Sequence, residues 1–510
     1  MISVAISPVP MLDSLTQWLL LHLPGPLLAG YVASLVFIFI YSLSQAHLIG
    51  HYVRSRRNIR LVPKARLTDA LPFVTVQLPV YNEKYVVARL LEAVARLRYP
   101  AHQLEIQVLD DSTDETTEII ARKAEELSHL SIRHLRRADR QGYKAGALGE
   151  GLRMAQGELI AIFDADFIPD EDFLLTTVAQ FSNPKVGMVQ TRWGHVNEAE
   201  NLLTRLQAFG LDTHFTVEQT GRFAGGFFLN FNGTAGVWRK RCIEEAGGWQ
   251  ADTLTEDLDL SYRAQLKGWQ FAYLEGVVSP AELPSLLRAY RLQQYRWTKG
   301  AAQNTRKHLL SVLKARLPWR QKWHATAHLL NSGLFVFVFL SSLLSVPALW
   351  IKNRVPAYAP YFQVASVCIL SFIVFALCYF VPVLYKAGSR KQALGAFLRT
   401  YPLFLSLSMG LSLHNALAVL EGYGNRKTPF VRTPKFNATP LSPTGPGIDR
   451  RRAFSWLCLL EGAFILYFGG GVWSAFYLGD FTLLLFHALL GVGFGLVFFY
   501  TLREPVHLPY

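Results

Sequence analysis

Apolar residues are strongly segregated along this chain of 510 residues. Residues 70–320 alternate strand-like and helix-like segments, as in a soluble α/β domain, whereas uncharged runs of membrane length lie outside this region. The chain is 51% hydrophobic and 17% charged, which is too apolar for an ordinary soluble enzyme and too charged for a pure membrane bundle. We therefore expect a multi-pass membrane protein in which an α/β domain is inserted between spanning helices.

Five segments are apolar and long enough to cross a membrane. They are residues 27–43, 325–350, 361–385, 454–478 and 481–502. Six Lys and Arg residues lie between Arg54 and Arg66, directly after the first segment. The positive-inside rule then places the N-terminus outside and the α/β domain in the cytoplasm.

Residues 401–420 form an ambiguous apolar segment. As a span, it would place residues 422–452 outside together with seven Lys and Arg residues, which the positive-inside rule disfavours. We expect instead an amphipathic helix in the cytoplasmic interface, with His414, Asn415 and Glu421 on its polar side.

The expected organisation has five parts. They are an N-terminal segment with the first span (1–50), the cytoplasmic domain (70–320), two spans (325–385), an interfacial helix with a cytoplasmic loop (400–452) and a C-terminal hairpin of spans (454–503). The sequence leaves the roles of Glu461 and His487, inside the last two spans, open.

The net charge of +14 does not indicate a nucleic-acid partner, because the basic residues cluster beside the apolar spans and no nucleic-acid motif is present. The four cysteines have no metal-ligand spacing, and we expect small buried hydrophobic side chains rather than a disulfide framework. They are Cys242, Cys368, Cys378 and Cys458.

Two aspartates end the apolar run of residues 158–166. Asp164 and Asp166 are one residue apart, and ligands of α/β sheets bind beyond the carboxyl ends of the strands. Two hard oxygen ligands suit Mg²⁺ or Mn²⁺ shared with a diphosphate. The same spacing recurs at residues 170–172 and 257–259, so the spacing alone is weak evidence.

A second strand-like run, residues 104–109, ends in Asp110 and Asp111, which can accept a base N–H or hold a sugar hydroxyl. Ser112 and Glu115 have the spacing of a helix capping box, which is the plainer interpretation of those two residues. It does not explain two adjacent aspartates before them.

Lys144 stands between Gly142 and Gly146, where it can approach a diphosphate as a point charge while the glycines let the backbone come close. Asp257 precedes an amphipathic helix. Acidic residues are common there because they favour the helix dipole, but the activation of an acceptor hydroxyl needs a carboxylate base, and Asp257 is the best-placed candidate.

Residues 293–297 bring an amide, a guanidinium and an indole together in Gln293, Arg296 and Trp297. Arg296 can neutralise a leaving diphosphate, and Trp297 offers a flat face to a sugar ring. The alternative is an Arg/Trp pair that anchors the chain at the membrane interface.

Taken together and in this order, these motifs resemble the family-2 inverting glycosyltransferases, specifically their processive cellulose synthase-like branch. The stretches that carry the resemblance are Pro79–Glu83, Asp110–Asp111, Tyr143–Gly146, Asp164–Asp166, Phe231–Thr234, Thr255–Asp257 and Gln293–Trp297. Longer stretches are most similar to plant mannan- and glucan-synthase-like proteins. These are residues 142–148, 163–167, 215–219 and 232–238.

The resemblance implies a glycosyltransferase domain of GT-A type with a mostly parallel sheet, and it implies roles for single residues. Tyr81, Glu83, Asp111 and Asp164 would hold the nucleotide-sugar, with Asp110 beside them, and Lys144 its diphosphate. Asp164 and Asp166 would bind the metal, and Asp257 would be the catalytic base. The acceptor would contact Phe231, Asn232, Gly233, Thr234, Glu256 and Trp297, and the diphosphate would contact Gln293 and Arg296.

Residues 430–435 resemble the gating loop of cellulose synthases, with Phe430, Thr433 and Lys435 at matching offsets, so Lys435 would also reach the diphosphate. The loop departs from that family at Arg432, where the family has valine.

The resulting hypothesis is a membrane-embedded inverting glycosyltransferase that polymerises a β-linked glucan or mannan from UDP-glucose or GDP-mannose and passes it through its own spans. One alternative is a non-processive transferase that adds a single sugar to a lipid. Another is a transporter or scaffold without catalysis, which the intact Asp164, Asp166 and Asp257 argue against. The short N-terminal extension and lean loops favour a bacterial plasma membrane over a Golgi membrane.

Overall fold

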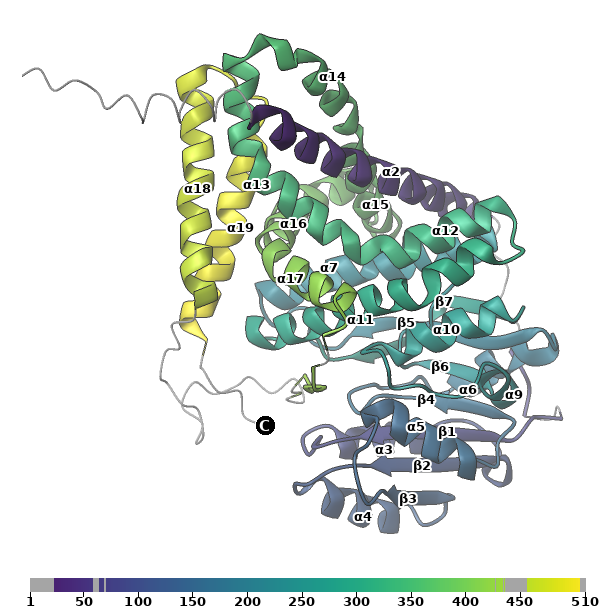
Figure 1. The fold of residues 1–510 in the computed structure, drawn as a ribbon. Helices are drawn as coiled ribbons and strands as arrows, with labels where there is room; N and C mark the ends of the chain where they lie inside the picture. Colours follow the sequence, from purple (N-terminus) through teal and green to yellow (C-terminus); the bar gives the residue numbers. More distant parts are fainter. Residues whose placement is uncertain are drawn as a thin grey trace, which may run out of the picture.

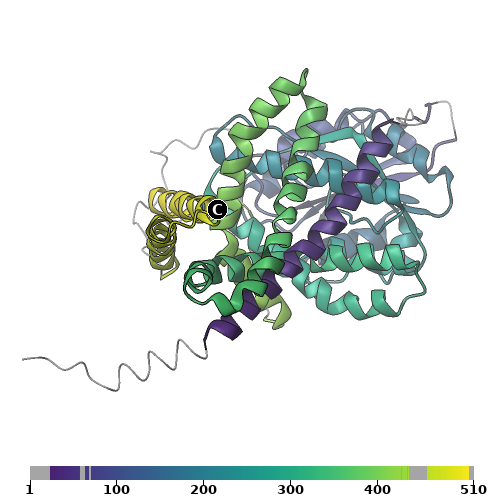
Figure 2. The same cartoon turned by 90° about the horizontal axis from the view of Figure 1, so that it is seen from above.

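The computed structural model describes residues 23–57, 64–67, 70–426, 428–433, 435 and 456–504. An α/β domain forms one end of the molecule and a group of long helices forms the other (Figure 1). Viewed from above, helix α2 crosses the domain diagonally and the last two helices stand to one side (Figure 2). The chain thus follows the predicted plan of a sheet domain between apolar helices.

Seven strands form one sheet in the order β3-β2-β1-β4-β6-β5-β7. Strand β6 is antiparallel to its neighbours β4 and β5, and the other neighbouring strands are parallel. The strands are β1 (Val74–Val80), β2 (Leu104–Asp110), β3 (Ile132–Arg136), β4 (Leu159–Ile162), β5 (Val186–His195), β6 (Gly236–Arg239) and β7 (Gln270–Ala281). The predicted mostly parallel sheet is confirmed.

Helices cover both faces of the sheet. This arrangement explains why the sequence of strand β4 is continuously apolar. Leu159 and Ala161 belong to one buried cluster, whereas Ile160 and Ile162 belong to another. Successive side chains of a strand point to opposite faces, so a strand buried on both faces needs apolar residues at every position. Asp164 is the first charged residue after this run, and it therefore lies where the strand leaves the core.

The helices of the domain are α3 (Val87–Ala95), α4 (Thr116–Glu126), α5 (Tyr143–Met154), α6 (Phe173–Val178), α7 (Leu202–Thr213), α8 (Gln219–Gly225), α9 (Lys240–Glu245), α10 (Glu256–Leu266) and α11 (Leu287–Lys314). A π-helical turn, η3 (His214–Glu218), joins α7 to α8. Short 3₁₀ turns are η1 (Ala101–Gln103), η2 (Ala179–Ser182), η4 (Leu330–Ser332) and η5 (Pro356–Tyr358).

The helices outside the domain are α2 (Pro24–Arg57), α12 (Trp319–Leu329), α13 (Gly333–Arg354), α14 (Ala359–Cys368), α15 (Leu370–Lys386), α16 (Arg390–Gly410), α17 (Ser412–Tyr423), α18 (Trp456–Leu478) and α19 (Leu484–Arg503). By length and composition, five helical stretches of the described chain can cross a membrane, the same number as predicted. Helix α2 is longer than the expected span, because Arg54, Arg56 and Arg57 form its last turn rather than a linker.

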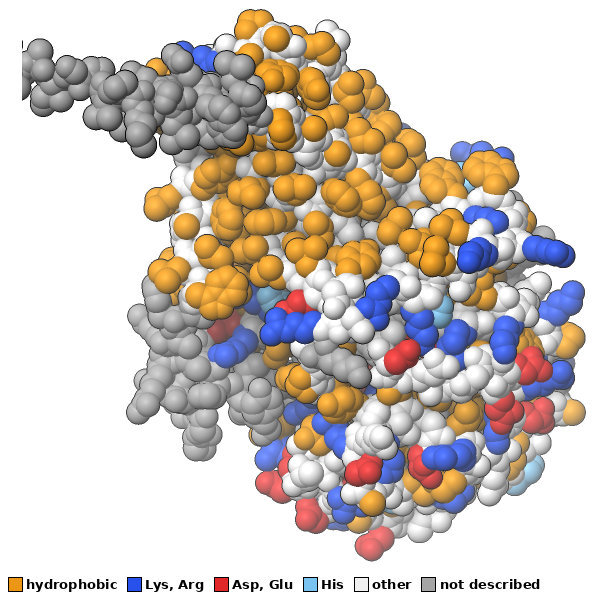
Figure 3. All heavy atoms as spheres, in the orientation of Figure 1, with side chains coloured by type: hydrophobic (Ala, Val, Ile, Leu, Met, Phe, Trp, Pro, Cys, Tyr) orange, Lys and Arg blue, Asp and Glu red, His pale blue; other side chains and the backbone are white. Residues whose placement is uncertain are grey.

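Hydrophobic side chains cover the helical end of the molecule on the face seen in Figure 3, and Lys and Arg side chains gather where it meets the domain. This distribution is the one expected for a membrane protein whose positive residues lie at the interface. All four cysteines lie in the described residues, and each is buried without a disulfide.

The ambiguous segment is a bent pair of helices rather than one interfacial helix. Helices α16 and α17 meet at an angle of 48°, and together they are apolar enough to form a sixth, broken span. The polar side of α17 faces the domain rather than water, since His414 lies 3.0 Å from the Arg291 carbonyl and Glu421 pairs with Lys299. Asn415 is buried. An interfacial placement of this segment therefore stays a prediction. The polar side of α17 contacts helix α11 instead of water.

Candidate active site

A cavity of about 210 Å³ opens beyond the carboxyl ends of β1, β2 and β4. Ligands of open α/β sheets bind at this edge. The sequence-predicted site residues that line the cavity are Tyr81, Glu83, Asp111, Lys144, Asp164, Asp166, Asn232, Gly233, Glu256, Asp257, Gln293, Arg296, Trp297 and Lys435. The fold thus brings most of the predicted site into one place.

Asp110 lies outside this cavity. Its buried carboxylate accepts hydrogen bonds from Ser112 N at 2.8 Å and Thr117 Oγ1 at 2.9 Å, and it lies 2.9 Å from His134 Nε2. Burial opposes ionisation of Asp110, but these hydrogen bonds outweigh it and lower the pKa of the carboxyl group. Asp110 therefore shapes the turn after β2, and the structure does not support its predicted contact with the nucleotide.

Phe231 and Thr234 also lie behind the cavity wall rather than in it. Phe231 is fully buried against the ring of Trp238, and Thr234 Oγ1 accepts a hydrogen bond from Asp164 N at 2.8 Å. They hold the loop in place while Asn232 and Gly233 face the cavity. Their predicted direct contact with an acceptor is corrected to a supporting role.

The capping-box interpretation of Ser112 and Glu115 is wrong. Helix α4 begins at Thr116, and Glu115 makes no side-chain capping bond there. Ser112 Oγ instead accepts a hydrogen bond from Asn82 N at 2.9 Å, and Asn82 has a φ of 54°. The serine therefore fixes a left-handed backbone position beside Tyr81.

Two arginines hold side chains at the end of the cavity next to β1 and β2, and the sequence reasoning missed both; Arg140 lines the cavity itself. Arg137 donates from Nε to Asp111 Oδ1 at 2.9 Å. The Arg140 guanidinium lies 3.3 Å from the centre of the Tyr81 ring. The only signal for them was the run of basic residues before Gly142, because their partners Tyr81 and Asp111 follow β1 and β2, far away in the sequence.

Lys144 follows a strained turn, since Gly142 has φ 73° and Tyr143 has φ 50°. Its Nζ donates to Asp164 Oδ1 at 2.5 Å and to the Gly233 carbonyl at 2.9 Å. Burial opposes the charge of Lys144, but the nearby Asp164 outweighs it, with the charge of Glu256 adding to the effect, and raises the pKa of the amine.

Gly146 has a packing role, and its predicted role in the approach of a diphosphate stays a prediction. A Cβ at this position would stand 2.1 Å from the Gln141 carbonyl oxygen. The missing side chain is therefore needed for the packing of the turn itself.

The two aspartates after β4 face cationic side chains. Asp166 Oδ2 lies 2.7 Å from Lys435 Nζ and accepts a hydrogen bond from Glu282 N at 3.0 Å, while Asp164 holds Lys144. Among the described residues, no group of three or more His, Cys, Asp or Glu side chains is arranged to bind a metal. A pair of carboxylates still fits Mg²⁺ or Mn²⁺, because such ions are often bound by one or two carboxylates together with substrate phosphates.

Asp257 lies in the first turn of α10 and accepts a hydrogen bond from Leu258 N at 2.8 Å. Burial, and next the charge of Glu256, raise the pKa of Asp257 to about 7. Burial also raises the pKa of Glu256. A carboxylate with a pKa near neutrality is suited to act as a general base at physiological pH.

Helix α11 supplies Gln293, Arg296 and Trp297 to the cavity. Arg296 donates to Thr433 Oγ1 at 2.7 Å, and its guanidinium lies 4.6 Å from the centre of the Phe430 ring. Burial lowers the pKa of Arg296 to about 10, so the group stays protonated at neutral pH.

The residue at which the loop 430–435 departs from cellulose synthases makes a direct contact in the site. Arg432 pairs with Glu83 at 2.8 Å. Burial raises the pKa of Glu83 to about 8, against the opposing effect of the Arg432 and Lys435 charges. The two cationic side chains of this loop, Arg432 and Lys435, therefore form ion pairs with Glu83 and Asp166, two carboxylates that line the cavity.

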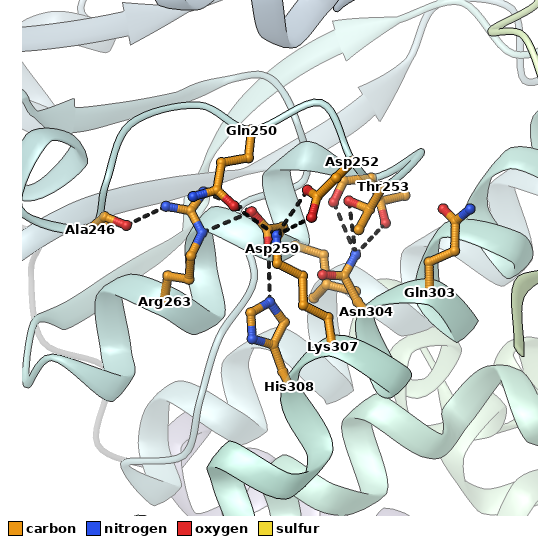
Figure 4. Close-up of polar contacts among 12 residues, drawn as sticks. Ala246, Gln250, Asp252, Thr253, Asp259, Arg263, Gln303, Asn304, Lys307 and His308 are labelled. Carbon is orange, nitrogen blue, oxygen red and sulfur yellow. Dashed lines mark hydrogen bonds and ion pairs between the residues drawn. The ribbon is translucent and has the colours of Figure 1, made fainter. Parts of the chain in front are cut away.

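A buried polar network ties α10, which carries Asp257, to α11 (Figure 4). Asp259 is fully buried and lies 2.7 Å from both His308 Nε2 and Lys307 Nζ. Asn304 Nδ2 donates to Thr255 Oγ1 at 2.9 Å. The network holds the start of α10 at a defined position relative to the helix that carries Arg296 and Trp297.

A second cavity, of about 520 Å³, continues from the first into the helical end of the molecule. Both cavities are lined by Trp193, Asn232, Asp257, Gln293 and Trp297. The far part of the second cavity is lined by residues of α2, α13, α15 and α16, among them Leu35, Val338, Phe375 and Phe404. Asp257 therefore stands where the two cavities meet.

Comparison with known proteins agrees with the resemblance drawn from the sequence motifs. The family model described as Glycosyltransferase like family 2 matches residues 72–300. Glucomannan 4-beta-mannosyltransferase 7 of Arabidopsis thaliana is 36% identical over 454 residues, which are 84% of this chain and 77% of the relative. Glucomannan 4-beta-mannosyltransferase 1 of Oryza sativa subsp. japonica is 46% identical over 254 residues, which are 48% of this chain and 49% of the relative.

The matches to several rice relatives cover only about half of each of those proteins, with shares of 53%, 50% and 49%. Among solved structures, mannosyltransferase PcManGT from Pyrobaculum calidifontis, in complex with GDP-Man and Mn2+, is 20% identical with a TM-score of 0.51, over 78% of this chain and 100% of that chain. This likeness shows the glycosyltransferase fold. Because the Arabidopsis relative matches across most of both chains, this chain belongs to the family-2 inverting glycosyltransferases, in their cellulose synthase-like branch.

Proposed function

We propose that this protein is a membrane-embedded hexosyltransferase that extends a β-linked mannan- or glucan-type polysaccharide from a nucleotide-activated hexose. GDP-mannose is the first choice of donor, because the plant relatives are named glucomannan 4-beta-mannosyltransferases. UDP-glucose is the second.

The observation that carries this proposal is the position of Asp257 at the junction of the two cavities. A polymerising enzyme needs a donor site and an acceptor path that meet at the base. The first cavity supplies a charged donor site, and the second supplies a path toward the spans. We propose that the glycan leaves the active site by this path.

In the proposed reaction, Asp257 removes the proton of the acceptor hydroxyl. The hydroxyl oxygen then attacks the anomeric carbon of the donor sugar and displaces the nucleotide diphosphate, so that the configuration of this carbon is inverted. Arg296 and Lys144 neutralise the charge on the departing diphosphate. Trp297 lies at the junction and offers its indole face to the terminal sugar of the acceptor.

Asp164 and Asp166 would hold the divalent ion. When bound, Mg²⁺ or Mn²⁺ would add positive charge at the diphosphate oxygens. Tyr81, Glu83 and Asp111 would contact the nucleotide, with Arg137 and Arg140 holding the Asp111 and Tyr81 side chains.

We also propose that the domain faces the cytoplasm, because Arg54, Arg56 and Arg57 end the first candidate span on the side of the domain. The choice of a bacterial plasma membrane over a Golgi membrane stays a prediction from the sequence. The relatives compared above are plant proteins and do not support that choice.

The proposal is tested by incubating membranes that carry the protein with radiolabelled GDP-mannose and UDP-glucose separately and sizing the product. We expect a polymer from GDP-mannose. Trp297→Ala should shorten or abolish it, whereas Trp319→Phe should have little effect, because Trp319 is 67% exposed and its ring contacts Trp323 and Arg320, which a phenylalanine can also do. Products that carry one sugar on a lipid, at every donor concentration, would establish the non-processive alternative instead.

A further inference from the structure

Acidic residues are absent from two long parts of the sequence that contain many Lys and Arg residues. No Asp or Glu occurs within residues 14–68 or within residues 283–420. A cation in either part can therefore pair only with a carboxylate from another segment of the chain. Arg56 does so, because its guanidinium lies 3.5 Å from the carboxylate of Glu275 in β7.

Two arginines, Arg54 and Arg320, stand out among the cations of these parts. Arg54 lies in the last turn of α2 and Arg320 near the start of α12, and both are exposed. Neither forms an ion pair with a carboxylate among the residues that the structure describes. The charges of both arginines act on His47 and His51. The two arginines therefore stand near the same point of the surface, although they are far apart in the sequence.

Helix α2 presents its share of these groups on one face. His47, His51 and Arg54 follow one another at spacings of four and three residues, which places them on the same side of the helix. The ring centres of His47 and His51 are 4.6 Å apart, and His47 Nδ1 lies 2.7 Å from His324 Nε2 of α12. Within the described part of the chain, the ring nitrogens of the partly buried His51 form no hydrogen bond. They are available to a ligand.

Helix α12 adds two stacked indole rings to this face. The ring centres of Trp319 and Trp323 are 6.4 Å apart, with an angle of 15° between the rings. The Trp323 ring lies 6.4 Å from the His47 ring, and the Arg320 guanidinium lies 5.5 Å from the centre of the Trp319 ring. Trp319 is 67% exposed. Exposed tryptophan beside cationic side chains is typical of the interface between a membrane and water.

The face lies at the ends of two candidate membrane spans. The first span ends at Arg57, and the next candidate span is Trp319–Arg354. Lys and Arg side chains gather where the helical end of the molecule meets the domain (Figure 3). An acidic protein would match only the cations of this face. A phospholipid with a negatively charged headgroup matches both the cations and the indole rings, so the observations favour a lipid.

We propose that Arg54, His51 and Arg320 bind the phosphate group of an anionic phospholipid, and that the rings of Trp319 and Trp323 lie along its glycerol backbone and acyl chains. The two guanidinium groups donate charge-assisted hydrogen bonds to the phosphate oxygens, and His51 adds a ring N–H donor. The bound lipid then holds the junction of α2 and α12 at the membrane leaflet next to the domain. This inference goes beyond the proposed sugar transfer and depends only on the protein lying in a membrane.

The test measures lipid binding to the full chain in detergent micelles by native mass spectrometry. The probes are dioleoyl phosphatidylglycerol, which is anionic, and dioleoyl phosphatidylcholine, which is zwitterionic and has the same acyl chains. The main variant is Arg54→Gln/Arg320→Gln, and Arg54→Lys/Arg320→Lys keeps the charge. The matched control is Arg96→Gln/Arg122→Gln, which removes the same charge from exposed arginines beside α3 and in α4, within the domain.

We expect the wild type to bind the anionic lipid about tenfold more tightly than the zwitterionic lipid, because both arginines attract its headgroup. The double glutamine variant should lose this preference, whereas the double lysine variant should keep most of it. The control should behave like the wild type. The replaced side chains are exposed, so thermal unfolding should be similar in all four proteins. If the double glutamine variant does not fold, the single variants Arg54→Gln and Arg320→Gln replace it, and each should lose part of the preference.

Three results would overturn the lipid site: no preference for the anionic lipid in the wild type, the full preference retained in the double glutamine variant, or an equal loss in the control. Displacement of the bound lipid by inorganic phosphate at matched ionic strength would also overturn it and assign the site to soluble phosphate. A wild type that binds poly-glutamate but neither lipid would assign the face to an acidic protein instead. Hexose transfer is measured separately, so a protein that makes no polymer but prefers the anionic lipid would refute only the proposed function.

Discussion

Gly233 and Asp257 lie so close together that a Cβ on Gly233 would stand 3.0 Å from Asp257 Oδ2. The same Cβ would stand 3.5 Å from Lys144 Nζ, and Gly233 has φ 82°. Glycine is therefore needed at this position for two reasons, the left-handed backbone and the space that the base carboxylate occupies. The glycine of the Asn-Gly-Thr stretch is thus needed to leave space for the carboxylate of Asp257.

Gly233→Ala should reduce kcat by about tenfold or more, because the new methyl group displaces the Asp257 carboxylate and the backbone strain costs about 1–3 kcal/mol. The control is Gly248→Ala, where φ is 70° but no atom lies within 4 Å of the added Cβ. It carries a similar backbone cost away from the base. Equal kcat values in the two variants would show that the contact with Asp257 does not matter.

Asp257→Asn keeps the shape of the base but removes its proton acceptor. We expect transfer to fall by about 100- to 10,000-fold, the usual range for loss of a general base, with donor affinity nearly retained. Asp164→Asn should instead weaken metal-dependent donor binding. Isothermal titration with GDP-mannose and Mn²⁺ separates the two effects, and turnover of Asp257→Asn within a few-fold of wild type would remove its assignment as the base.

The pH dependence of the reaction should report the Asp257 carboxyl group. The base works only when deprotonated, and its pKa is raised to about 7 by burial and then by Glu256. The value of kcat/KM should therefore rise as the pH rises through about 7 and level off above it. Initial rates at low donor concentration, measured from about pH 5 to about pH 9, give this profile.

Glu256→Gln provides the internal check on that profile. It removes a negative charge that raises the Asp257 pKa, so the rising limb should move to lower pH. A limb that stays in place would mean that another group controls the profile.

Asp259→Asn should destabilise the protein by about 3–5 kcal/mol, because it removes the fully buried carboxylate that Arg263, Lys307 and His308 contact. Asp252→Asn is the control. Its side chain is 57% exposed and also pairs with Lys307, so we expect a loss of only about 0–1 kcal/mol. Thermal unfolding in detergent compares the two, and similar melting temperatures would argue against a stabilising role for the network.

Several features could be predicted from the sequence because they depend on neighbouring residues. The apolar run before Asp164 and the abrupt change to acidic residues are enough to place the end of β4. The roles of Asp110 and Asp111 were separable in principle, since adjacent residues at the end of a strand point to opposite faces. Only Asp111 faces the cavity.

Other features depend on contacts between distant segments and could not be predicted. Nothing around Arg432 in the sequence indicates Glu83 as its partner, and nothing around His214 indicates Asn232. The polar side of α17 was visible in the sequence, but a single amphipathic pattern does not distinguish water from a partner helix. The pairing of Glu421 with Lys299 decides that question.

Helix α11 has a consequence for any attempt to obtain the catalytic domain as a smaller soluble protein. Its Lys299 is fully buried and takes its counter-charge from Glu421, and its Arg291 pairs with Glu461 of α18. A chain cut after α11 would retain both cations and lose both carboxylates, so the helix that presents Arg296 and Trp297 would no longer be held in place. Catalytic domain and membrane helices are therefore one inseparable unit for expression, purification and inhibitor screening.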